Sequence, residues 1–128
     1  MQTASLNRKE VAINDGNDSI IIVRDLGDIP GGRTLDTTGY TPDTIPCGMV
    51  VIKKANGDYA PHPLATNGKA YAASAGTGNT IVGVVKYTVL TADPRVAIMT
   101  MGQINQAACA IPFTDAIKTA LKHIDFLY

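Results

Sequence analysis

The chain has 128 residues, and its eleven Lys and Arg side chains balance eleven Asp and Glu side chains, so its formal net charge is zero. This length predicts one domain, and the lack of a basic excess argues against a dedicated nucleic-acid-binding protein. Hydrophobic residues make up 45% of the chain and aromatic residues only 5%. No apolar run is long enough to span a bilayer, so we expect a globular protein with a small-aliphatic core and no membrane segment.

The first 46 residues are acidic and contain little that a core would bury. Residues 1–46 hold four basic and seven acidic groups, a balance of −3, whereas residues 47–128 hold seven basic and four acidic groups, a balance of +3. The one concentrated apolar run in the first part is Ile20-Ile21-Ile22-Val23, and β-branched residues of this kind predict a strand. We therefore divide the chain into an N-terminal arm with one strand, residues 1–46, and a compact β-rich body, residues 47–128.

The predicted strand of the arm has no partner strand close to it in the sequence. Because an isolated strand is not stable in water, this strand must pair with the body, with a sister subunit or with another protein. We favour an arm that docks on a partner over a first strand packed on its own domain. The residues assigned to this docking are Ile20, Ile21, Ile22, Val23 and Arg24.

The body shows short aliphatic runs separated by turn residues. Asn56-Gly57 is a strong hairpin signal, because both residues tolerate a positive φ. The predicted elements, in chain order, are strand 48–53, turn 55–58, strand 59–60, loop 66–80, strand 81–90, turn 91–94 and strand 95–101. The last of these strands has apolar side chains on both faces, so we expect it to be covered on both sides.

The only predicted helix begins after Pro112 and Phe113. Thr114 is placed to cap it, and Asp115 suits its positive N-terminal end. A single apolar stripe follows, formed by Ala116, Ile117, Ala120, Leu121 and Ile124. Residues 124–128 predict a short final strand. The expected fold class is α+β, mainly β, with one short C-terminal helix and an extended N-terminal arm.

The residue types that catalysis and metal binding use are scattered singly. Neither His62 nor His123 accompanies a nucleophile elbow, and no C-x-x-C, H-E-x-x-H or calcium-loop spacing occurs. Cys47 and Cys109 are too few for a disulfide framework, and no apolar secretory segment opens the chain, so we expect two buried free thiols. We expect no enzyme, no metal or other cofactor and no small-molecule substrate.

From Pro46 onward, four short motifs follow one another. They are Met49-Val50-Val51, Asn56-Gly57-Asp58-Tyr59, Val82-Gly83-Val84-Val85 and Gly102. This layout covers about two-thirds of the chain and resembles the small head decoration proteins of tailed bacteriophages, the lambda type, and the related auxiliary capsid or head-fibre proteins. The resemblance implies a mixed β fold, trimers on the outer capsid surface and an N-terminal segment that reaches the major capsid protein. The chain differs from this family in its longer, acidic N-terminal region.

The expected function is that of a structural virion protein. The protein would be made in the host cytoplasm and would bind the outer surface of a phage capsid as a homotrimer. It would stabilise the capsid by bridging neighbouring major capsid protein subunits. A strand in an arm suits addition to the edge of a neighbour's sheet, and repeated copies add avidity. Two alternatives remain open: a head-fibre base or host-surface-binding module that presents the Thr66–Thr80 loop, and a small enzyme.

Overall fold

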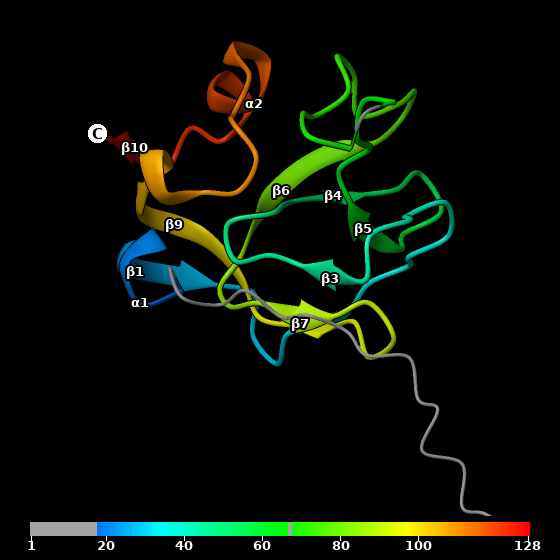
Figure 1. Ribbon diagram of the computed structural model, residues 1–128, viewed down its shortest axis with the longest axis horizontal. Coiled ribbons are helices and arrows are strands. Elements are labelled where there is room, and N and C mark those ends of the chain that lie inside the picture. Colours follow the sequence, from blue (N-terminus) through cyan, green and yellow to red (C-terminus); the bar gives the residue numbers. More distant parts are fainter. Residues whose placement is uncertain (1–17, 67) are drawn as a thin grey trace, which may run out of the picture.

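A six-stranded sheet organises the computed structural model, which describes residues 18–66 and 68–128 (Figure 1). In chain order the elements are α1 (Asp18–Ile21), β1 (Ile22–Asp28), β2 (Arg33–Thr34), β3 (Thr44–Ile45), β4 (Val50–Lys53), β5 (Tyr59–Pro61), β6 (Thr80–Val85), β7 (Val89–Leu90), β8 (Arg95–Val96), β9 (Ile98–Asn105), the 3-10 helix η1 (Gln106–Ala108), α2 (Asp115–Ala120) and β10 (Ile124–Leu127). The structure is 38% strand and 12% helix, which confirms the expected mainly β class.

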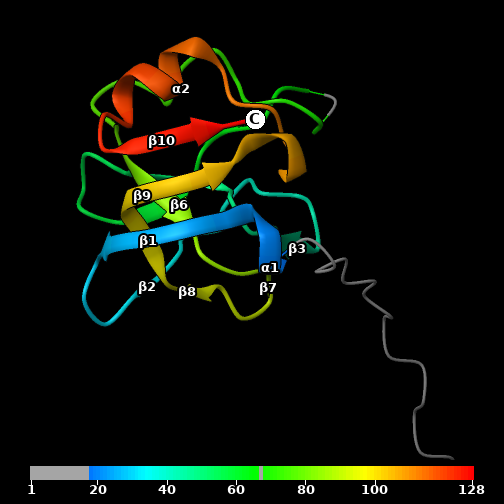
Figure 2. The same cartoon turned by 90° about the vertical axis from the view of Figure 1, so that its left-hand side faces the viewer.

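Strand β9 pairs with three strands of the main sheet, whose strand order is β1-β9-β6-β4-β5 with β10 paired to β9 off this path. Its first two residues pair with the end of β6, and residues 102–105 pair with β10, the one parallel partner in this sheet. Its opposite edge pairs with β1 in antiparallel orientation. Figure 2 shows β10, β9 and β1 side by side. Two small antiparallel pairs, β2 with β8 and β3 with β7, complete the topology.

The core is built from small aliphatic side chains, as the composition predicts. Its most enclosed members are at most 1% exposed: Ile45, Cys47, Met49, Val50, Val51, Val84, Val85, Ile98, Met99, Ile104 and Ile117. Three aromatic rings extend this core toward α2 and β10. The ring centroids of Tyr71 and Phe113 lie 6.1 Å apart, and those of Phe113 and Phe126 lie 4.8 Å apart.

The hairpin and the C-terminal helix form where the sequence predicts them. The backbone N–H of Lys54 donates to the Asp58 carbonyl over 2.7 Å, and Gly57 adopts a φ of +95° at the turn. The Thr114 hydroxyl accepts from the N–H of Ile117 over 3.3 Å, which confirms the predicted cap of α2. The buried stripe is narrower than expected, because Ala116 and Ala120 are exposed.

Two predicted strands are each divided in the structure. The prediction of one strand over 81–90 is wrong, because β6 ends at Val85 and β7 begins at Val89. Between them, the Thr88 N–H and hydroxyl donate to the two Asp18 carboxylate oxygens over 2.8 and 2.7 Å, which draws the backbone out of the ladder. The prediction of one strand over 95–101 also fails, since β8 and β9 flank Ala97 and β9 continues to Asn105.

Residues 18–46, which we assigned to the arm, share the sheets and the core of the body. The strand of this region finds its partner within its own chain, because β1 pairs with β9. Strands β2 and β3 also pair with β8 and β7, and Ile21, Leu35 and Ile45 are buried in the common core. The remainder of the predicted arm, residues 1–17, lies outside the described residues.

The apolar run 20–23 is a helical turn followed by a strand. Ile20 and Ile21 belong to α1, and the strand begins at Ile22 and continues through the polar residues that follow. The turn carries the Ile21 side chain into the core, where it is 4% exposed and lies against Gly48. Burial of Ile21 and the Asp18–Thr88 hydrogen bonds therefore account for a helical turn where β-propensity predicts a strand.

Candidate functional site

Strand β1 is an edge strand whose ladder is interrupted. Between residues 22 and 24, and again between 25 and 27, β1 advances by two residues while β9 advances by one. Val23 and Leu26 are the extra residues, and their side chains are 46% and 59% exposed. β-Bulges of this kind bend and twist an edge strand, so the edge of β1 is a poor template for adding a further strand.

Large apolar side chains gather on and beside this strand. Within the described part of the chain, six large hydrophobic residues are exposed, and five of them belong to α1, β1, β9 and the C-terminus. We call these five the α1–β1 surface: Ile20, Val23, Leu26, Met101 and Tyr128. Three of them, Ile20, Val23 and Tyr128, line one shallow groove, and neighbouring exposed apolar side chains are typical of interaction sites.

A shallow groove lies at the α1 end of this surface. It is lined by Ser19, Ile20, Ile22, Val23, Asn105, Ala107 and Tyr128. Within residues 18–66 and 68–128, Asn105 Oδ1 is the one enclosed side-chain oxygen or nitrogen that has no hydrogen-bond partner. A buried acceptor without a donor costs about 1–3 kcal/mol, so a partner that brings an N–H or O–H group into the groove would relieve this cost.

Among the described residues, some charged side chains on and beside β1 form ion pairs, and one does not. Lys86 Nζ forms ion pairs with Asp25 and with Asp28, the latter at 2.9 Å, and the hydrogen bonds that it donates to both carboxylates raise the pKa of Lys86. These contacts tie β1 to the segment after β6. Arg24 is exposed and has no ion pair with any described residue, so its charge is available to a partner.

The five residues predicted to dock therefore divide between surface and core. Ile20, Val23 and Arg24 are exposed, whereas Ile21 is buried and Ile22 packs against the core. The prediction missed Leu26, Met101, Tyr128 and Asn105. The sequence contains a sign of Leu26, because a lone leucine between Asp25 and Gly27-Asp28 interrupts an otherwise polar segment.

The described residues with reactive side chains do not assemble a metal site. Within the described ranges, no three His, Cys, Asp or Glu side chains gather as a metal site would require. Cys47 and Cys109 are free thiols, buried and half-buried respectively, and burial raises the pKa of each to about 12. His62 is buried, and its burial lowers its pKa. His123 is exposed near the C-terminal end of α2.

No protein-family model, curated protein sequence or solved structure matches the chain. Neither α-helix among the described residues has the length and apolar character that crossing a membrane requires. The function is therefore inferred from the residues and their geometry, above all from the α1–β1 surface.

Proposed function

We propose that the chain is a structural virion protein that decorates the outer surface of a phage capsid and bridges neighbouring major capsid protein subunits. The α1–β1 surface carries the proposal, because it exposes apolar side chains beside a buried acceptor, Asn105 Oδ1, that lacks a donor. The motif layout from Pro46 onward, which resembles that of head decoration proteins, supports the same function.

The contact proposed here uses side chains in place of strand addition. The two bulges interrupt the hydrogen-bonding edge of β1, and the same bulges present Val23 and Leu26 to solvent. Ile20 and Tyr128 extend the apolar contact toward the groove, and Arg24 supplies a charge for an acidic group of the capsid. An apolar centre with a charged edge is the usual composition of a protein–protein interface.

Repeated copies account for stabilisation without tight single contacts. A homotrimer on a threefold position of the capsid would present three α1–β1 surfaces at once, so weak contacts would combine into strong binding. Because such a protein binds the assembled particle and not its dissociated subunits, it stabilises the particle by mass action.

A second candidate function is that of a head-fibre base or host-surface-binding module. One observation favours it: a cavity is lined by Thr66, Gly68 and Asn79, which lie at the two ends of the predicted loop. In this reading the Thr66–Thr80 segment faces the host surface and the α1–β1 surface faces the virion.

The test is co-sedimentation with purified empty heads of the phage that encodes the chain. The samples are the full chain, residues 18–128, and a triple variant in which Ile20, Val23 and Leu26 are each replaced by Ser. Truncation stops before Asp18, because Ile21, Leu35 and Ile45 belong to the core and a deletion through residue 46 would unfold the body.

We expect the full chain to pellet with the heads and the folded triple variant to remain in the supernatant. Loss of binding in 18–128 alone would move the contact to residues 1–17. If the full chain fails to pellet with both immature and expanded heads, the capsid proposal is wrong and the host-surface function becomes the one to test.

A further inference from the structure

A cavity of about 430 Å³ opens between the segment 36–42, the β4–β5 hairpin and the segment 62–66. These segments lie at the right of Figure 1, whereas α1 and β1 lie at the left. Five apolar residues are among its lining residues: Ile52, Ala60, Pro61, Pro63 and Leu64. This size and lining are typical of small-molecule sites, which combine apolar walls with a few well-placed polar groups.

His62 supplies the most enclosed polar group of the cavity. Its side chain is 2% exposed, and Nδ1 lies 2.9 Å from the Pro63 carbonyl oxygen. Because a carbonyl oxygen only accepts, Nδ1 carries the proton, and burial lowers the pKa of the ring so that it is neutral at pH 7. Nε2 is then an acceptor on a residue that lines the cavity.

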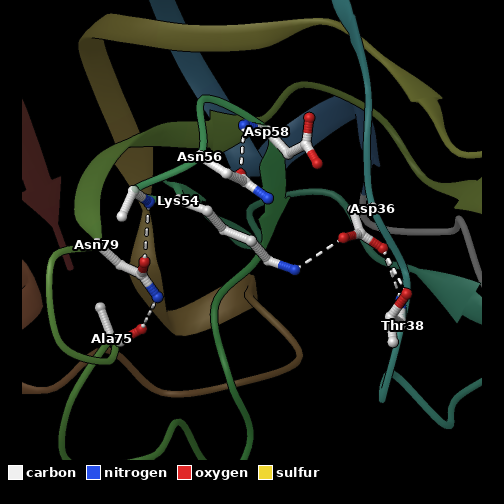
Figure 3. Close-up of polar contacts among 8 residues, drawn as sticks. Asp36, Thr38, Lys54, Asn56, Asp58, Ala75 and Asn79 are labelled. Carbon is white, nitrogen blue, oxygen red and sulfur yellow. Dashed lines mark hydrogen bonds and ion pairs between the residues drawn. The ribbon is translucent and has the colours of Figure 1, made fainter.

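The walls of the cavity are held by polar contacts (Figure 3). Lys54 Nζ lies 2.8 Å from Asp36 Oδ2, and the Thr38 hydroxyl donates to Asp36 Oδ1 over 2.7 Å. Asn79 accepts from the Ala55 N–H and donates to the Ala75 carbonyl over 2.8 Å, so the loop that it ends is fastened to the hairpin.

The cavity carries a matched pair of charges. Asp36 and Lys54 are the charged residues of its lining, and their contact neutralises the rim. An ionic ligand would have to compete with this pair, whereas a neutral hydroxyl can accept from Lys54 and donate to Asp36 without separating them. Tyr40 adds a ring whose position is set by its hydroxyl, which donates to the Thr44 carbonyl over 2.7 Å.

From these observations we infer that the cavity binds a neutral saccharide unit, with one sugar hydroxyl donating to His62 Nε2 and others meeting the Asp36–Lys54 pair at the rim. The inference does not depend on capsid binding, because the cavity and the α1–β1 surface share no residue. It adds a ligand site to the chain, and on an assembled virion that site would recognise a surface glycan.

The test is a titration of the ¹⁵N-labelled full chain with methyl glycosides of glucose, galactose, mannose and N-acetylglucosamine, followed by NMR. Glucuronate and glucosamine, which have the same size but carry a charge, are titrated in parallel. We expect saturable shifts of the amides in 36–42 and 62–66 from at least one neutral glycoside, and weaker binding of the charged sugars.

Three variants identify the residues responsible. His62→Phe removes the acceptor and keeps a ring, so it is expected to weaken binding about tenfold or more, as for loss of a buried hydrogen bond. Thr41→Trp places a bulky ring at an exposed position of the rim, and it is expected to weaken binding by blocking entry of the sugar. His123→Phe changes the other, exposed histidine and should leave binding unchanged. Because Thr41→Trp does not touch the core, it keeps the test valid if His62→Phe fails to fold.

The inference is overturned if no neutral glycoside gives saturable shifts, or if binding persists in the folded Thr41→Trp variant. It is also overturned if the charged sugars bind the same residues more tightly. Failure of the chain to pellet with heads would affect only the capsid proposal.

Discussion

Replacing Leu26 with Ser tests whether the bulged edge of β1 makes the capsid contact. Leu26 is 59% exposed in the free chain. Since full burial of a leucine side chain contributes about 1.5–3 kcal/mol, covering the exposed part contributes about 1–2 kcal/mol, which corresponds to roughly a five- to thirty-fold change in affinity. The free energy of unfolding should change by less than about 0.5 kcal/mol, because the side chain is largely solvated without a partner.

The assay is depletion of labelled protein from the supernatant by increasing amounts of empty heads. Tyr87→Ser is the matched control, because Tyr87 is 47% exposed but does not belong to the α1–β1 surface. Urea unfolding of each variant separates a loss of contact from a loss of fold. Equal affinity of the Leu26→Ser variant and the unmodified chain would refute the assignment, as would an equal loss in the Tyr87 control.

Three further predictions concern the fold and its titrating groups. Gly102→Ala should destabilise the chain by about 3 kcal/mol or more in urea unfolding, because a Cβ there would overlap the Arg24 carbonyl oxygen and push β1 from β9; a neutral substitution would contradict the close packing of these strands. Hydrogen bonds to Asp36 hold the pKa of its carboxyl well below the ordinary value, so it contributes stability that is present above about pH 4 and is lost as the pH falls through the depressed pKa. Urea unfolding gives the difference in unfolding free energy between the unmodified chain and the Asp36→Asn variant. This difference should be constant near neutral pH and should shrink below about pH 4. A difference that does not change with pH would exclude the ionised carboxylate as its origin. Because burial raises the pKa of Cys47 and of Cys109 to about 12, both thiols should react with iodoacetamide far more slowly than free cysteine at pH 8, and denaturant should abolish the difference.

Local signals in the sequence were sufficient for the elements whose contacts are local. Asn56-Gly57 predicts its hairpin because the turn itself requires a positive φ, and Thr114 predicts its cap because the bonded N–H lies three residues away. The aliphatic run Val50-Val51-Ile52 predicts the strand that β4 forms, because β-branched residues favour an extended backbone. In each case the residues that decide the structure are neighbours in the chain.

Pairings between distant residues were not predictable in this way. The polar end of β1 forms a strand because the backbone of β9 is available to it, which the side chains of residues 24–28 do not reveal. The helical turn α1 depends on Thr88, seventy residues away, whose hydroxyl and N–H bind the Asp18 carboxylate. The candidate surface also depends on such pairings, since the bulges that expose Leu26 exist only in the register between the two strands.

The placement of β9 between strands from opposite ends of the chain has a consequence for biosynthesis. Strand β1 ends at Asp28, but its partner begins at Ile98, and the parallel strand that completes the sheet ends at Leu127. A nascent chain on the ribosome therefore holds β1 without its partner until β9 has been made, and the main sheet is complete only after β10 has followed. Non-local pairing of this kind slows folding and leaves apolar strands open to aggregation. We expect that chains truncated before β10 accumulate as insoluble material, because the sheet then lacks the parallel partner of β9.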